Sequence, residues 1–269
     1  MDFNFSDDQE QLRDAVRKWV DKGYDFERRR KAVEAGGFDR SVWNELAELG
    51  LAGLYIPEAD GGMGMGPVEG MVVMEELGRG MVLEPLNQAL IAGGVLSGYA
   101  PDALKTEWLP RIAAGDALVV LASQERRARY RLDVCDAKAT QSSVGWSLTA
   151  TKNVVPVGDQ ADAFLVPATV NGAVALFLVA RGASGVSTRG YGTQDGGRAA
   201  DLILQNAPAS LITTDGLAAL ELAEDIGIAA TCAEAVGVMD KTVDLTAEYL
   251  NTRKQFGVPI GSFQALRHR

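Results

Sequence analysis

The sequence is poor in the residues on which most metal sites and nucleophilic sites depend. Its 269 residues include a single histidine, His268, and only two cysteines, Cys135 and Cys232. A zinc site needs several imidazole or thiolate ligands, so a zinc site of that kind is excluded, as is a catalytic triad whose histidine is not His268. Two cysteines also cannot build a disulfide framework. We therefore expect a protein of a reducing compartment, the cytoplasm.

Long apolar runs and an excess of positive charge are missing as well. No stretch of the sequence approaches the roughly 18 consecutive apolar residues of a membrane span, and residues 1–11 are acidic where a signal peptide would be basic. Lysine and arginine number 26 against 36 aspartates and glutamates, which gives a formal charge of −10. This charge disfavours nucleic acid and anionic membranes as partners.

Hydrophobic periodicity changes twice along the chain and predicts three parts. Residues 1–115 show helical spacing, with a capping-box pattern at Ser6 and Gln9 and a helix that Pro67 begins and Gly78 ends. Residues 116–212 contain short runs rich in valine and leucine, and residues 213–269 are helical again. The predicted fold class is therefore α+β, with an N-terminal all-α domain, a central β-barrel-like domain and the start of a C-terminal helical bundle.

Within the second and third parts, the pattern predicts individual elements. Asn171-Gly172 is a hairpin signal, because both central residues of a type I′ turn need positive φ. Gly227 and Gly237 lie inside the long predicted helix, which indicates close packing or a bend there. The predicted strands are 117–122, 146–152, 163–166 and 173–179, and the predicted apolar side of the long helix consists of Ile226, Ala229, Ala230, Ala233, Val236 and Val243.

Two further segments attract attention by their composition. Residues 50–66 contain six glycines, but they lack the Lys-Ser/Thr of a Walker loop, so we interpret these glycines as turn residues rather than as a phosphate cradle. Residues 249–257 have basic residues and a final glycine, as expected where a helix ends. Helix termination does not, however, require Gln255 and Phe256 before Gly257, or Phe263 and Gln264 after it.

The chain resembles the acyl-CoA dehydrogenase family in these segments. The glycine-rich loop 50–66, the run from Gly145-Trp146 through Leu148 to Lys152, and the pattern Arg253, Gln255-Phe256-Gly257, Ile260, Phe263-Gln264 occur in the family's order and spacing. The resemblance covers the whole chain. It implies FAD-dependent oxidation of an acyl-CoA to the trans-2-enoyl-CoA, in which a carboxylate takes the α-proton and an electron-transfer flavoprotein takes the electrons.

The resemblance also implies roles for particular residues. Arg253 is expected to meet the FAD pyrophosphate of a neighbouring subunit, and Gln255, Phe256 and Gln264 are expected to line the same cofactor. An FAD site shared in this way implies a homo- or hetero-oligomer, such as a dimer of dimers. The chain's own flavin is expected to lie against Ser123, Gln124, Val154 and Pro156.

The flavin loop departs from the family pattern. Gln124-Glu125 is followed by arginines at 126, 127, 129 and 131, where the family has proline and glycine. Together with residues 189–200, this loop is similar to the small-subunit branch that includes pimeloyl-CoA dehydrogenase. The arginines either bind CoA phosphates or form a solvated basic loop. Arg129 and Tyr130 are the substrate-binding candidates, and an arginine of this loop could hold the distal carboxylate of a dicarboxylyl-CoA.

Two other departures concern the flavin and the base. Val154 and Pro156 replace an aromatic residue and a threonine, and proline has no N–H to offer the flavin. The family's usual catalytic glutamate would lie beyond Arg269. A minority of the family carries its base at the position of Gly227, which cannot act, and Glu224 lies one turn earlier. Two functions follow: an FAD-dependent acyl-CoA dehydrogenase, or a partly degenerate, non-catalytic subunit that completes a partner's FAD site. A third, more remote alternative is a helical acyl-CoA-binding module without redox chemistry.

Overall fold

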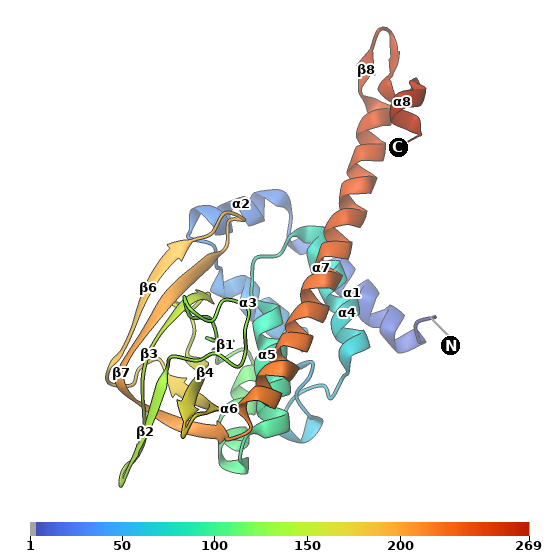
Figure 1. The fold of residues 1–269 in the computed structure, drawn as a ribbon. Coiled ribbons are helices and arrows are strands. Elements are labelled where there is room, and N and C mark those ends of the chain that lie inside the picture. Colours follow the sequence, from blue (N-terminus) through green and yellow to red (C-terminus); the bar gives the residue numbers. More distant parts are fainter. Residues whose placement is uncertain (1–3, 269) are drawn as a thin grey trace.

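The computed structural model describes residues 4–268 and shows a helical part, a closed sheet and one long helix, in that order along the chain (Figure 1). This arrangement confirms the predicted fold class. The first three residues of the acidic N-terminal stretch lie outside the described residues. The helices before the sheet are α1 Asp7–Gly23, α2 Phe26–Glu34, α3 Arg40–Glu48, α4 Pro67–Gly80, α5 Leu86–Tyr99 and α6 Asp102–Ala113, with short 3-10 turns at Leu51–Gly53 and Glu58–Asp60.

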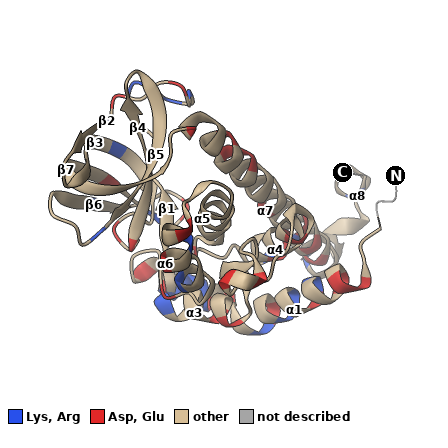
Figure 2. Ribbon diagram, turned by 90° about the horizontal axis from the view of Figure 1, so that it is seen from below, with Lys and Arg blue, Asp and Glu red and all other residues tan. Residues whose placement is uncertain are grey.

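The N-terminal helices form where local signals and burial agree. At the start of α1, the Gln9 amide donates to Ser6 Oγ at 3.2 Å and the Ser6 amide donates to Gln9 Oε1 at 3.0 Å, so the predicted capping box is present. Helix α5 has no charged residue and lies among the other helices, whereas α1 and α3 carry charges of both signs (Figure 2). Nine residues of α5 are buried, which makes it the centre of the helical core.

The prediction that Gly78 ends a helix is wrong, because α4 continues to Gly80 and Gly78 lies at a helix crossing. A Cβ atom at Gly78 would lie 2.2 Å from the Glu234 carbonyl oxygen of α7, and one at Gly237 would lie 1.8 Å from the Glu75 carbonyl oxygen of α4. The two glycines therefore allow the backbones of α4 and α7 to approach closely. Close packing is thus confirmed at Gly237, whereas a Cβ at Gly227 would meet Ile91 Cδ1 at an ordinary 3.4 Å.

The central sheet closes on itself. Strand β4 pairs with β2 and β5, β5 pairs with β7, β7 pairs with β3, and β3 pairs with β2, so these five strands form a ring. The remaining two strands are additional partners: β1 pairs with β4, and β6 pairs with β7. Closure of this kind leaves few exposed strand edges. The strands are β1 Val119–Leu121, β2 Lys138–Ser142, β3 Gly145–Pro156, β4 Ala163–Val170, β5 Ala173–Ala180, β6 Val186–Gly192 and β7 Arg198–Thr213.

The four predicted runs lie in or around β1, β3, β4 and β5, and the hairpin at Asn171-Gly172 is present, with φ of 49° and 85°. Strands β2, β6 and β7 were not predicted. Strand β2 is largely exposed and polar, β6 is also mostly solvent-facing, and the sequence of β7 contains Asn206 and Pro208. None of the three shows a clear alternation of apolar and polar residue types in its sequence. The domain boundaries near 115 and 212 remain predictions.

The long helix α7, Gly216–Thr252, packs against α4 and α5 and then continues beyond the body of the protein (Figure 1). Its buried residues are small except for Leu220, and they include Ala230, Ala233 and Gly237. The predicted apolar side is therefore only partly correct, because Val236 and Val243 are 46% and 67% exposed. Small side chains suit the close contact with α4, and the larger apolar residues face away from it.

Beyond α7 lies a short terminal segment, residues 253–268, which we call the arm. It contains β8 Lys254–Gln255, β9 Val258–Pro259, a 3-10 turn at Ile260–Ser262 and α8 Gln264–Arg267. Figure 1 shows it at the far end of α7, away from the sheet. No helix within residues 4–268 combines the length and the apolar character that crossing a membrane would need.

Candidate functional site

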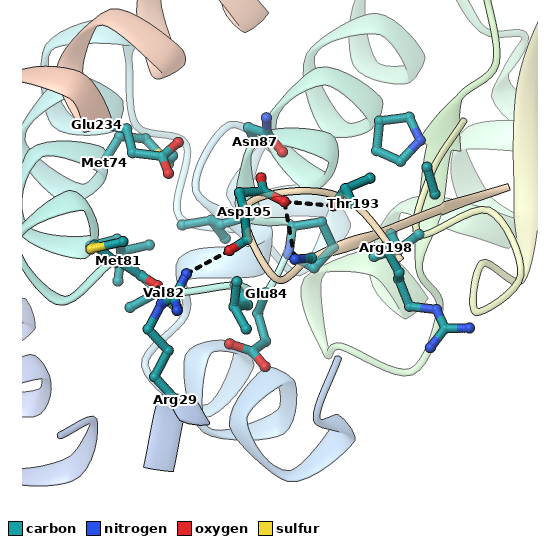
Figure 3. A pocket seen from close by; sticks show the side chains of 18 of the residues that line it. Arg29, Met74, Met81, Val82, Glu84, Asn87, Thr193, Asp195, Arg198 and Glu234 are labelled. Carbon is teal, nitrogen blue, oxygen red and sulfur yellow. Dashed lines mark hydrogen bonds between the residues drawn. The ribbon is translucent and has the colours of Figure 1, made fainter. Parts of the chain in front are cut away.

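A cavity of about 370 Å³ lies where the helical part, the sheet and α7 meet (Figure 3). Its walls come from α4, the α4–α5 connection, the end of β3, the β6–β7 hairpin and α7. We call it the main cavity. Its size is in the range of small-molecule sites, and both Val154 and Pro156 line it. Apolar side chains such as Met74, Leu77 and Leu86 cover much of the remaining wall.

The end of β3 has an irregular backbone at this wall. The register between β3 and β7 shifts between Lys152 and Val155, and Val154 has a φ of 52°. A β-branched residue rarely adopts this conformation, so the backbone is strained here. The Val154 side chain is half-exposed and borders both the main cavity and a neighbouring cavity beside Gln124. This irregularity in β3 therefore places Val154 between the main cavity and its neighbour.

A buried ion pair supports this part of β3. Lys152 Nζ lies 2.6 Å from Glu125 Oε1, and both side chains are almost completely buried. The Glu125 carboxylate also accepts hydrogen bonds from the amides of Asp136 and Ala137. Burial opposes ionisation of Glu125, but the Lys152 ammonium and the two amides outweigh it and keep the pKa of Glu125 below its usual value. The pair joins the flavin loop to β3.

The structure brings together the residues predicted for the chain's own half of the site. Gln124, Arg129 and Tyr130 line two cavities of about 100 and 540 Å³, Ser123 lines the smaller, and Val154 lines the larger. The larger cavity borders the main cavity at Val154, and it shares Gln124, Arg129 and Tyr130 with the smaller one. Residues far apart in the sequence thus line neighbouring cavities.

The four arginines of the flavin loop are not equivalent. Arg127 pairs with Asp136 at 3.2 Å and Arg131 pairs with Asp133 at 2.6 Å, both at the surface. Such exposed pairs contribute little to stability, but they neutralise two of the four charges. The guanidinium groups of Arg126 and Arg129 have no acidic partner among residues 4–268. Binding of CoA phosphates and a solvated loop both remain open for these two.

Glu224, the predicted alternative base, does not line the main cavity. It is exposed on α7 and borders the cavity of about 100 Å³, beside Leu220 and Tyr130. A Cβ atom at Gly227 would meet the Ile91 side chain of α5. Neither residue lies at the wall formed by Val154 and Pro156, and the role of Glu224 remains a prediction.

The main cavity contains acidic residues that the sequence analysis missed. Glu234 of α7 lines it, and burial, followed by the nearby charge of Asp195, raises the pKa of Glu234 above its usual value. Glu84 is only 4% exposed, and its burial raises its pKa to about 7. One signal for Glu234 was available: it follows Gly227 by seven residues, which is about two turns and so the same helix face. No comparable signal marked Glu84.

The two arginines of the same wall are engaged. Arg29 donates to the carbonyl oxygens of Met81 and Asp195, at 2.9 and 2.8 Å. Arg198 forms a bidentate pair with Asp159 and donates to the Gly36 carbonyl oxygen. The wall of the main cavity therefore offers no arginine free of protein partners within residues 4–268.

The residues predicted to meet a neighbouring subunit's flavin lie in the arm. Arg253, Gln255, Phe256 and Gln264 are all exposed, and the Phe256 side chain is 93% exposed. Its ring contacts Phe263 edge-on at 6.2 Å. The arm does not border the main cavity, so one chain separates the two predicted halves of the FAD site. Phe256 and Phe263 are thus two exposed aromatic residues in contact with each other on the arm.

Two segments of the chain match known family domains. Residues 6–116 match the acyl-CoA dehydrogenase N-terminal domain, and residues 215–269 match the acyl-CoA dehydrogenase C-terminal domain. The chain is 32% identical over 236 residues to the acyl-CoA dehydrogenase FadE27 of Mycobacterium tuberculosis, a match that covers 86% of this chain and 61% of the relative. The chain thus spans about six tenths of that relative's length.

Solved structures show the same likeness. The ChsE4-ChsE5 complex from Mycobacterium tuberculosis is 30% identical with a TM-score of 0.88, and the match covers 100% of this chain and 73% of the other. A glutaryl-CoA dehydrogenase from Mycobacterium smegmatis, solved in complex with FADH2, has a TM-score of 0.91 at 21% identity, with coverage of 98% and 70%. The second likeness concerns the fold alone.

Proposed function

Because the chain belongs to the acyl-CoA dehydrogenase family, we propose that it is a subunit of an oligomer that oxidises an acyl-CoA thioester to the trans-2-enoyl-CoA. FAD is the cofactor of this family. The observation that carries the proposal is the separation of two half-sites in one chain. Val154 and Pro156 line a cleft in the body, while Arg253 and Phe256 lie exposed on the arm. A second chain is needed to bring such halves together.

The residues present fit FAD on chemical grounds. Arg253 has no acidic partner within residues 4–268, and a guanidinium suits the geometry of a pyrophosphate. Phe256 offers an exposed aromatic face, and the cleft beside Val154 and Gln124 has room for a flat ring system. When bound, FAD accepts the hydride that leaves the acyl β-carbon.

The chain's own residues would orient the substrate and exclude water. The apolar wall of Met74, Leu77 and Leu86 would take up the acyl chain, and Arg129 with Tyr130 would hold the CoA portion near the neighbouring cavities. Pro156 has no amide N–H, so it would contribute shape and no hydrogen bond. We expect an electron-transfer flavoprotein to reoxidise the cofactor, in the cytoplasm.

A test starts from the protein purified with its natural partner chains. The complex should be yellow, and it should reduce an artificial electron acceptor when an acyl-CoA is added. Replacement of Arg253 by alanine should lower the flavin content of the complex severalfold, because the pyrophosphate loses a bidentate donor. Lys254→Ala removes an equal charge at the adjacent exposed position and should leave the flavin content unchanged. Equal flavin retention in both variants would remove the role of Arg253.

The second candidate is a non-catalytic subunit that lends its arm to a partner. It is favoured by Val154 and Pro156, since neither side chain can donate a hydrogen bond to a flavin. The two candidates differ in stoichiometry. If this chain holds its own flavin, a heteromer contains two FAD per pair of unlike chains. If it only lends the arm, the heteromer contains one, and absorbance against protein concentration distinguishes the two values.

A further inference from the structure

Two polar side chains without protein partners converge on the main cavity. Glu234 reaches it from α7, and Asn87 reaches it from the first turn of α5. Neither side chain makes a hydrogen bond or an ion pair with another residue of the described chain. In the view of Figure 3, Glu234 lies beside Met74, and Asn87 lies above Asp195. A few polar groups in an otherwise apolar cavity are what orients a bound ligand, so these two side chains mark the place for a polar ligand group.

The charges around this point select against an anionic ligand group. Glu234 and Asp195 are both carboxylates, and burial, followed by the nearby charge of Asp195, raises the pKa of Glu234 above its usual value. Arg198 is paired with Asp159, and Arg29 donates to two carbonyl oxygens. A terminal carboxylate on a substrate would therefore face like charges without a free arginine to receive it. Such a group would bind poorly here.

A cationic group is disfavoured for a different reason. The Arg29 guanidinium lies in the same wall, where its positive charge would oppose that of a cationic ligand group. A neutral group that donates a hydrogen bond suits the site better than either ion. A hydroxyl meets this description, because it can donate to the Glu234 carboxylate and accept from the Asn87 amide.

We propose that the main cavity takes an acyl group that bears a hydroxyl near Glu234 and Asn87, and that it discriminates against an acyl group ending in a carboxylate. The proposal rests on the proposed function, since it assigns the main cavity to the acyl chain. The apolar residues Met74 and Leu77 line the rest of the path, so the hydroxyl is an isolated polar group on an otherwise apolar acyl group. This assignment runs against the dicarboxylyl-CoA that the flavin-loop arginines suggested.

The experiment compares three acyl-CoA thioesters of equal chain length, one unsubstituted, one with a terminal hydroxyl and one with a terminal carboxylate. The intact complex is titrated calorimetrically under anaerobic conditions and also assayed by turnover. The hydroxyl compound should bind at least tenfold more tightly than the carboxylate compound, which is the discrimination that one hydrogen bond to a charged group provides. The unsubstituted compound should lie between them.

Variants separate the hydrogen bond from the charge. Glu234→Gln keeps an acceptor oxygen, so it should keep the preference for the hydroxyl while binding the carboxylate compound several times more tightly. Glu234→Leu removes the acceptor, and the unsubstituted compound should then bind best. Asp225→Asn, an exposed change on the same helix outside the main cavity, should leave the ranking as it is in the unaltered complex.

The outcomes distinguish this proposal from the proposed function. If turnover is normal but the carboxylate compound binds best, or if Glu234→Leu leaves the ranking unchanged, the assignment of the cavity fails and the oxidation stands. If no compound is oxidised while the titrations give the expected ranking, the proposed oxidation fails and the binding assignment stands.

Discussion

The buried pair of Lys152 and Glu125 gives the sharpest prediction about stability. Replacing Lys152 by methionine preserves most of the side-chain volume but leaves the Glu125 carboxylate without its cation. Lys152 is 0% exposed, so water cannot take over the role of the ammonium group. Breaking such a pair from one side costs about 3–5 kcal/mol. Because a domain is stable by roughly 5–15 kcal/mol in total, the variant should lose a large fraction of its stability.

The assay is urea unfolding followed by circular dichroism at neutral pH. Lys152→Met should lower the free energy of unfolding by about 3–5 kcal/mol. It should also weaken flavin retention, because the ion pair holds the loop of Gln124 against β3. The double variant Glu125→Gln with Lys152→Met should recover part of the loss, since no buried charge then remains. Lys138→Met, at an exposed position of β2, serves as the control and should change stability by less than about 0.5 kcal/mol.

The pH dependence of the pair follows from the direction of the shift. The pKa of Glu125 lies below its usual value in the folded protein, so the folded state binds the carboxyl proton less readily than the unfolded state does. The stabilisation is therefore complete above the usual carboxyl pKa and is lost as the pH falls through the lowered value. The substitution itself also tests the pair, because breaking it should cost about 3–5 kcal/mol. If the free energy of unfolding of Lys152→Met lies within about 1 kcal/mol of that of the unaltered protein, the assigned role of the pair is wrong.

Two further predictions concern Glu84 and Gly237. The pKa of Glu84 is raised from 4.5 to about 7, so the folded state keeps a proton that the unfolded state releases, and stability falls as the pH rises between these values. The difference of about 2.5 pKa units corresponds to about 3 kcal/mol of stability. Glu84→Gln should therefore abolish the slope of the free energy of unfolding against pH between pH 5 and 8. An unchanged slope would show that Glu84 is not its cause. Gly237→Ala places a methyl group against the Glu75 carbonyl oxygen, so it should lower the stability measured by thermal unfolding by about 1–3 kcal/mol. At Gly227, an added methyl group meets only the flexible Ile91 side chain, so Gly227→Ala should be neutral or stabilising. Equal effects of the two glycine changes would show that α4 and α7 are not in close contact.

The sequence by itself determined the fold class and the family. Helical spacing in the first part, valine-rich runs in the second and the hairpin at Asn171-Gly172 are local signals, because the periods of 3.6 and 2 residues follow from backbone geometry. The pattern from Arg253 to Gln264 identified the family for the same reason: its residues are close in the sequence. Strands β6 and β7 were missed because their formation depends on pairing with each other and with β3, not on alternation.

Only the tertiary structure decided how distant residues combine. It showed that Gly78 lies where α4 crosses α7. It also showed that Val154 and Pro156, which the family resemblance predicted to lie against the flavin, are separated from the arm. It also placed Glu234 and Asn87 in the lining of one cavity, although their residue numbers differ by 147. Such contacts result from packing between helices and the sheet, where side chains from remote segments share one space. No period in the sequence records that packing, so the cavity and its charges had to be found in the fold.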